Sequence, residues 1–197
     1  MSFMKAVKHR RSVYSLGKEE VVPKDTVTTI VSDAVLHTPS PFNSQSGRVV
    51  VLFGKESDRF WKLVGDSLKP LVPPDAFGKT QERLDGFSAG YGTVLFFEDE
   101  AVVTGLQEQY SLYADKFPVW SLQSNGMLEF VVWTALEEAG LGASLQHYNP
   151  VVDDKVKAAW NVPASWKLLA QIPFGKDLNH PVEKEFSPLE GRLKVYG

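Results

Sequence analysis

The polar loop at residues 39–46, Pro-Ser-Pro-Phe-Asn-Ser-Gln-Ser, carries side chains suited to recognising a planar ligand. Its prolines fix the backbone and its serines favour turns. Asn43 and Gln45 stand two residues apart, and each carboxamide offers hydrogen-bond donors and an acceptor. Because binding residues are frequent on loops held by a rigid scaffold, the loop is a candidate ligand site. The alternative is a well-made turn without a ligand.

Arg10, Arg11 and Ser12 form a second candidate site near the start of the sequence. Guanidinium groups bind phosphate oxygens in bidentate geometry, and the serine hydroxyl adds a further donor. The sequence therefore predicts an anion site of the kind that holds a phosphate. The alternative is a solvated helix end, where cations interact favourably with the helix dipole.

Two other motifs lack the residues that their chemistry needs. Gly78-Lys79-Thr80 resembles the end of a P-loop, but Pro73 stands where that loop requires its first glycine. The glycine pairs at 90/92 and 140/142 lack the third glycine of a dinucleotide fingerprint. The four histidines show no metal-like spacing along the chain, so the sequence predicts no metal site: His9, His37, His147 and His180.

Ser88 lies in Gly86-Phe87-Ser88-Ala89-Gly90, which matches the G-x-S-x-G motif of serine hydrolases. That motif needs a strand before the serine and a helix after it. Here a polar segment precedes the serine and a predicted strand follows it. A glycine-rich turn is the stronger interpretation, and a serine hydrolase using Ser88 remains a minor alternative.

The composition is typical of a globular protein, at 43% hydrophobic and 23% charged residues over 197 positions. A net charge of −3 gives no long-range attraction to nucleic acid or to an anionic membrane. No apolar run approaches a membrane span, and the first residues lack a signal-peptide core. The absence of cysteine removes disulfides, thiol nucleophiles and cysteine-based metal sites. We therefore expect a cytoplasmic protein that binds neither nucleic acid nor membrane.

The elements that position these residues follow from hydrophobic spacing and from breaker residues. We expect a short amphipathic helix before residue 10, then helices at 24–38, 57–69, 104–116, 121–139 and 153–160. Asp25 is expected to cap the helix at 24–38. The glycines at 140 and 142 are expected to end the helix at 121–139. Strands are predicted at 49–53, 92–97 and 166–174.

This pattern predicts a single α+β, three-layer domain over residues 1–197, with a central sheet and one very apolar helix. Residues 175–197 form a C-terminal extension without helical periodicity. The run 192–196, Arg-Leu-Lys-Val-Tyr, has the pattern of an edge strand. Because termini become ordered when they join a sheet, this tail is expected to add a strand to its own sheet or to a second subunit.

Taken together, these segments resemble the nitroreductase family of FMN-dependent oxidoreductases. The resemblance rests on 8–12 (Lys-His-Arg-Arg-Ser), 39–45 (Pro-Ser-Pro-Phe-Asn-Ser-Gln) and 140–143 (Gly-Leu-Gly-Ala). Two further sequence segments are similar to those of the subgroup named after the fungal fatty-acid-repression-mutant proteins. They are 90–99 (Gly-Tyr-Gly-Thr-Val-Leu-Phe-Phe-Glu-Asp) and 145–150 (Leu-Gln-His-Tyr-Asn-Pro).

The resemblance implies a homodimer with a central, mostly antiparallel sheet flanked by helices, a C-terminal tail exchanged between subunits, and FMN at the interface. Arg10, Arg11 and Ser12 match the motif that holds the flavin phosphate and ribityl chain, and Lys184 matches a lysine that approaches the phosphate. The remaining matches are the loop that reaches the flavin from the other subunit and the segment beside the flavin ring: Ser40, Asn43 and Gln45, and Leu145, Gln146 and His147.

Four positions depart from the family pattern. Tyr14 stands in the flavin-binding segment where many members carry Lys or Arg, and Phe186 stands where many carry Arg. Gln146-His147 replaces a common Glu-Gly pair, which favours a higher flavin reduction potential because a carboxylate is absent. The family's mid-chain flavin contacts have no clear counterpart around Arg83.

The resemblance also implies the reaction. NAD(P)H reduces the flavin, and a nitroaromatic, quinone or similar acceptor then takes two electrons from the same face in a ping-pong mechanism. The cofactor supplies the chemistry, so no catalytic protein residue is required. Four aromatic residues are candidates for lining the open face, with core or interface packing as the alternative: Tyr110, Tyr113, Phe117 and Trp120. A flavin-binding sensor or storage protein with little turnover would use the same site.

Overall fold

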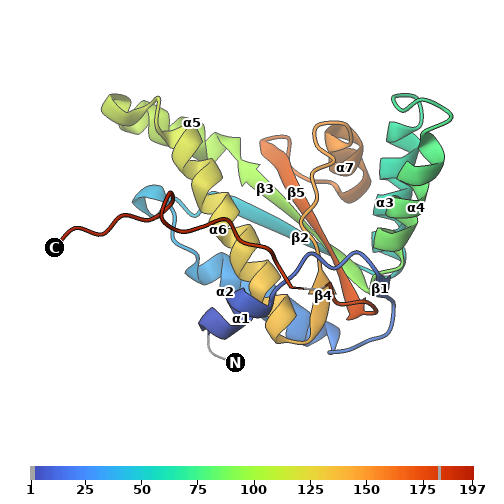
Figure 1. Cartoon of the computed structure of the whole chain (residues 1–197). Helices are drawn as coiled ribbons and strands as arrows, with labels where there is room; N and C mark the ends of the chain where they lie inside the picture. Colours follow the sequence, from blue (N-terminus) through green and yellow to red (C-terminus); the bar gives the residue numbers. More distant parts are fainter. Residues whose placement is uncertain (1–2, 182) are drawn as a thin grey trace.

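The computed structural model describes residues 3–181 and 183–197. A central sheet lies between two helical layers (Figure 1). It contains β1 (Leu16–Gly17), β2 (Gly47–Phe53), β3 (Gly92–Asp99), β4 (Leu141–Ala143) and β5 (Trp166–Asp177). The strand order is β1-β5-β3-β2, β4 also pairs with β5, and every pairing is antiparallel. The prediction of an α+β three-layer fold is confirmed.

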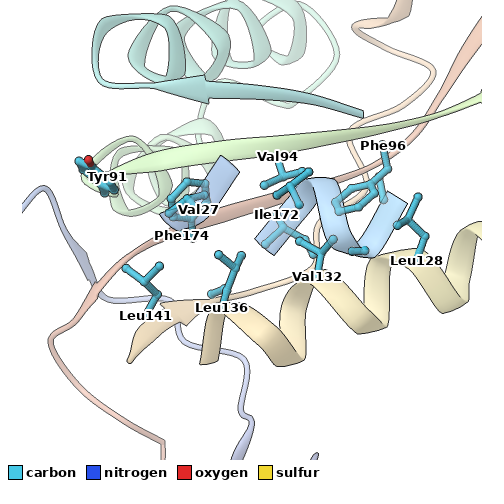
Figure 2. Close-up of a cluster of buried hydrophobic side chains, with 14 residues drawn as sticks. Val27, Tyr91, Val94, Phe96, Leu128, Val132, Leu136, Leu141, Ile172 and Phe174 are labelled. Atoms are coloured by element: carbon cyan, nitrogen blue, oxygen red, sulfur yellow. The ribbon is translucent and has the colours of Figure 1, made fainter. Parts of the chain in front are cut away.

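One helical layer contains α2 (Lys24–His37) and α6 (Phe117–Glu138), with α1 (Phe3–His9) against α6. Apolar side chains of α6 face β3 and β5 in a continuous core, as Figure 2 shows for Leu128, Val132 and Leu136 opposite Phe96 and Ile172. All five side chains are buried, and burying each one stabilises the fold by roughly 1.5–3 kcal/mol.

The opposite layer contains α3 (Lys55–Leu68), α4 (Phe77–Ser88) and α7 (Asp153–Trp160). It packs on the other face of the sheet through a second core that includes Phe60, Trp61 and Phe87. The side chain of Thr93 on β3 faces this layer and accepts a hydrogen bond from the Trp61 indole at 2.8 Å. The helix α5 (Glu100–Gln109) and two short 3-10 turns, η1 (Pro41–Asn43) and η2 (Ser111–Tyr113), complete the described elements.

The sequence located most elements within a few residues, and four local expectations were wrong. The helix predicted at 104–116 is α5, which begins at Glu100 because the Asp99 carboxylate accepts the Ala101 backbone N–H at 3.3 Å. Pro23, rather than Asp25, occupies the cap position of α2. Gly140 ends α6 with a positive φ of 86°, but Gly142 lies within β4. The polar segment at 81–85 lies within α4, which the sequence analysis did not predict.

The tail after β5 forms no strand among residues 183–197, so the expected edge strand at 192–196 is wrong for a single chain. In the view of Figure 1 it passes in front of α6, and it ends away from the body of the domain. Its apolar side chains are exposed: Phe186, Leu189, Leu193, Val195 and Tyr196. Nothing in the described residues is a helix both long and apolar enough to cross a membrane.

Candidate functional site

Arg10 stands at the end of α1 with its guanidinium held over an aromatic ring. The guanidinium carbon lies 3.9 Å from the centre of the Trp133 ring of α6. Its Nε and Nη1 atoms are buried, and neither has a hydrogen-bond partner within residues 3–181 and 183–197. Burial lowers the pKa of Arg10; the Glu137 carboxylate opposes this, and the Arg11 charge adds to it. A half-buried cation with two buried, unused donor nitrogens is suited to an anionic ligand.

Arg11 forms hydrogen bonds within the chain through Nη1 and leaves Nε without a partner in the described residues. Its Nη1 donates to the carbonyls of Lys8, His9 and Arg10 at 2.8, 2.9 and 3.0 Å. These contacts satisfy carbonyls at the end of α1, which a helix leaves without partners. The Nε atom is buried and finds no partner in the described part of the chain. Arg11 therefore has a fixed position and an unused donor.

Lys184 joins these two arginines from the other end of the chain. The pKa of Lys184 is lowered, first by burial and then by the charges of Arg10 and Arg11. A cavity of about 540 Å³ lies here, lined by Val7, Lys8, Arg11, Glu183, Lys184 and Phe186. The three cations Arg10, Arg11 and Lys184 repel one another, and an anion bound between them would offset that repulsion. The donor set fits a phosphate group.

Strand pairing brings the two ends of the chain together. The Val13 N–H donates to the Ala143 carbonyl of β4 at 2.9 Å, and Leu16 of β1 pairs with Asp177 of β5. The Leu178 N–H then donates to the Ser15 carbonyl at 3.1 Å. The segment from Arg10 through half-buried Ser12 therefore lies against β4 and beside the start of the tail.

Leu145, Gln146 and His147 continue from β4 along the same edge of β5. Gln146 and Gln171 exchange two backbone hydrogen bonds, at 2.8 and 2.9 Å. Leu145 packs against the core, Gln146 is half-buried and His147 is exposed. The structure thus brings this segment and the arginine segment to the same edge of the sheet.

A second cavity, of about 380 Å³, opens beside Tyr14. Its other lining residues lie on α4: Lys79, Glu82, Arg83, Gly86 and Phe87. Burial raises the pKa of Tyr148, and the positive charge of Arg83 opposes that rise, so Arg83 acts near the 145–148 segment. Sequence reasoning missed Lys79 and left Arg83 unassigned because it did not predict α4. Their spacing of four is the available signal, since it places both on one helix face.

The loop at 39–46 has an unusual and well-supported backbone. Phe42, Asn43 and Gln45 all adopt positive φ angles, of 54°, 52° and 48°. Ser40 supports this shape, because its Oγ accepts the Gln45 N–H at 2.8 Å and its carbonyl accepts the Asn43 N–H at 3.0 Å. Left-handed non-glycine residues cost free energy and persist where surrounding contacts hold them.

Side chains around the loop supply those contacts. The Ser124 hydroxyl of α6 donates to the Pro39 carbonyl at 2.9 Å. The Phe42 ring packs against Tyr110 and Phe117 at centroid distances of 4.8 and 5.3 Å. Tyr113 lies 6.2 Å from the same ring, so three of the four candidate aromatic residues pack against the loop. Asn43 and Gln45 remain exposed and free of the core, in a position to meet a ligand or a second chain.

The loop and the cations lie at different places along α6. Pro39 contacts Ser124 and Arg10 contacts Trp133, which lies about 13 Å further along the helix at roughly 1.5 Å per residue. Within one chain the structure does not bring Ser40, Asn43 and Gln45 to the cation cluster. This separation agrees with the implied arrangement, in which the loop serves the flavin of another subunit.

Ser88 has the wrong surroundings for a nucleophile elbow. It is the last residue of α4, and the strand β3 follows it, so the order of elements is reversed. Its hydroxyl donates to Asp58 at 3.4 Å. The structure gives no support to the serine hydrolase alternative.

Comparison with known proteins identifies the family of the chain. The family described as Nitroreductase family matches residues 7–176. Nitroreductase FRM2 of Saccharomyces cerevisiae is 35% identical over 199 residues, covering 99% of this chain and 97% of the yeast protein. Nitroreductase CinD of Lactococcus lactis, solved with nicotinic acid, matches at a TM-score of 0.92 and 46% identity over 100% of both chains. CinD has also been solved with 4-nitrophenol.

A more distant nitroreductase with bound FMN, from Desulfitobacterium hafniense, shares the fold at a TM-score of 0.72. It is 16% identical, and the match covers 100% of both chains. The family match over most of the sequence and the full-length similarity to FRM2 lead to one conclusion: this chain is an oxidoreductase that belongs to the nitroreductase family, in the fatty-acid-repression-mutant subgroup.

Proposed function

We propose that the chain is an FMN-dependent oxidoreductase that passes two electrons from NADH or NADPH to nitroaromatic, quinone or similar acceptors. The observation that carries the proposal is the convergence of Arg10, Arg11 and Lys184 around buried, unused guanidinium nitrogens. Members of the family bind flavin, and the ribityl phosphate of FMN matches this donor set. The 4-nitrophenol and nicotinic acid bound by CinD have the ring chemistry of an acceptor and of a nicotinamide.

Each group of residues has a separate task in this proposal. Arg10, Arg11, Ser12 and Lys184 hold the phosphate and ribityl chain. The segment at 145–147 lies along the flavin ring with Tyr14 nearby, and Arg83 adds positive charge on the same side. Ser40, Asn43 and Gln45 reach the ring from the second subunit.

FMN, when bound, supplies the two-electron chemistry, accepting electrons from a nicotinamide and releasing them to the acceptor. The chain contributes position, charge and exclusion of water. Donor and acceptor use one open face in turn, which makes the reaction ping-pong. Because the electron donor is a cytoplasmic nucleotide, we place the reaction in the cytoplasm.

The proposed enzyme is a homodimer that exchanges its C-terminal tails. β2 is the last strand in the sheet order, so no strand of the described chain covers its outer edge. A groove of about 600 Å³ runs beside it, lined in part by Val35, Leu36, Val49 and Val51. The exposed apolar tail has the composition to fill that groove in a second copy.

A flavin sensor or storage protein is the alternative, because the same residues would hold FMN in either case. The first test is the cofactor itself. We expect purified protein to carry one FMN per chain, and Arg10→Gln and Lys184→Gln to weaken FMN binding to the apoprotein by about tenfold or more. The exposed Lys69→Gln is the matched control. Wild-type protein that takes up no FMN would remove the proposal.

A further inference from the structure

Two histidines and a carboxylate meet where the two ends of the chain come together. His9 ends α1, Glu137 lies in the last turn of α6, and His180 follows β5. One potential ligand atom from each lies within 4.8 Å of the other two. Spacing along the sequence could not reveal this group, because it pairs histidines from opposite ends of the chain.

The buried Glu137 carboxylate has one oxygen without a hydrogen-bond partner in the described residues. Its side chain is only 5% exposed. The Oε1 atom meets His9 Nδ1 at 2.7 Å, while Oε2 is buried and has no hydrogen-bond partner in the described residues. A buried carboxylate oxygen without a partner costs about 1–3 kcal/mol or more. A cation at this position would satisfy it.

His180 is oriented as metal-binding histidines are. Its Nδ1 meets the Asp177 Oδ2 atom at 2.6 Å. A carboxylate at Nδ1 favours the tautomer that carries its proton there, which leaves the Nε2 lone pair available to a metal. Asp177 also adds negative charge to the cluster, and the Glu137 carboxylate opposes the positive charge of Arg10.

His9 can reach a shared ion by a small rearrangement. Its ring stacks on that of His180 at a centroid distance of 4.8 Å and an angle of 29°. A metal lies in the plane of each imidazole that binds it, so one of two stacked rings has to turn. The His9 side chain is 57% exposed, so its ring has room to turn. The turn gives up the stacking on His180 and the 2.7 Å contact with Glu137, which shared coordination of one ion would replace.

We propose that His9, Glu137 and His180 form a binding site for a divalent transition-metal cation, best matched by Zn²⁺, with Asp177 as the supporting carboxylate. Imidazole and carboxylate are accepted zinc ligands, and three protein ligands leave one position for water. A bound ion would join α1, α6 and the first residues of the tail. It would thereby fix the point from which Lys184 extends toward the arginines. The proposal does not depend on the flavin.

The test is a calorimetric titration of Zn²⁺ into full-length protein freed of metal with EDTA. We expect saturation at one ion per chain, and affinity at least about tenfold lower in His9→Gln and in His180→Gln. Asp177→Asn should lower it by about 10–100-fold, as loss of a supporting carboxylate does elsewhere. His37→Gln, at the exposed end of α2, is the matched control and should bind as the wild type does.

Co²⁺ provides a second measurement that does not rely on the folding of a variant. The chain contains no cysteine, so bound Co²⁺ can have no thiolate ligand. The proposal predicts strengthened visible absorption that one equivalent of Zn²⁺ abolishes. Absence of saturable Zn²⁺ binding, an unchanged Co²⁺ spectrum, or equal affinity in folded His180→Gln and His37→Gln proteins would each overturn it.

Discussion

The guanidinium carbon of Arg10 lies 3.9 Å from the centre of the Trp133 ring, and this contact orients a cation that forms no hydrogen bond through Nε or Nη1 in the described chain. Trp133 is itself fixed, because its indole N–H donates to the Ala143 carbonyl at 3.1 Å. The tryptophan therefore connects Arg10, the cation proposed to bind phosphate, to the strand that leads to Gln146 and His147.

The first prediction concerns this contact. Trp133→Leu should weaken FMN binding by about fivefold, because a cation–π contact contributes about 1 kcal/mol. The measurement is quenching of FMN fluorescence by apoprotein. Trp160→Leu is the matched control, since Arg59 lies 5.2 Å from that ring in the opposite layer. Equal FMN affinity in the two variants would show that Trp133 does not position Arg10.

The second prediction separates side chain from backbone at Asn43, whose φ is 52°. Asn43→Gly keeps this conformation accessible and removes the carboxamide, whereas Asn43→Ala also adds backbone strain. Both variants should weaken FMN binding to a similar extent, by about 3–10-fold for one lost hydrogen bond. A loss confined to the alanine variant would mean that the loop shape matters and the amide does not. Gln45→Ala should also weaken binding.

The third prediction concerns Glu129, which is buried on α6 at 9% exposure. Burial raises the pKa of Glu129 from 4.5 to about 7. The native state therefore retains a proton that the unfolded chain releases, and stability falls as pH rises from about 4.5 to 7. Glu129→Gln should remove that loss and stabilise the protein at pH 8 by up to about 3 kcal/mol.

Urea unfolding at pH 5 and pH 8 measures this effect. The exposed Glu108→Gln serves as the control and should change the free energy of unfolding little at either pH. The increase in the free energy of unfolding from wild type to Glu129→Gln should be larger at pH 8 than at pH 5. An equal difference at the two pH values would contradict the conclusion that burial raises the pKa of Glu129.

Much of the fold follows from the sequence because apolar spacing and breaker residues agree along most of the chain. The helix at 153–160 was predicted at its observed bounds. The strands at 49–53, 92–97 and 166–174 were predicted two or three residues shorter than the observed strands. α4 was missed because only Leu84 and Phe87 are buried along it, which leaves too few apolar positions to show a period. β4 was missed because three residues are too short for a pattern.

The site was predictable only in part. Arg10, Arg11 and Lys184 were identified by resemblance, and the structure brings them together. Trp133 was not identified, because a tryptophan within an apolar helix gives no sign that its ring faces a cation. The group formed by His9, Glu137 and His180 depends on contacts between distant segments, which local spacing does not encode.

The fourth prediction concerns assembly. The protein should have a solution mass near twice that of one 21.9 kDa chain. Removing residues 187–197, or introducing Val195→Asp, should shift the population toward monomer and lower FMN occupancy, because the tail would no longer cover the β2 groove. Light scattering after size exclusion reports both mass and flavin absorbance. A wild-type monomer that binds FMN fully would contradict the shared site.

The central claim is tested most directly by anaerobic mixing of the FMN-loaded protein with NADH or NADPH, followed by 4-nitrophenol or a quinone. We expect one nucleotide to bleach the flavin absorbance as it transfers two electrons to each FMN, and the acceptor to restore the colour without further NADH or NADPH. Bleaching by neither nucleotide on the timescale of turnover would contradict the oxidoreductase proposal and favour a flavin sensor or storage protein.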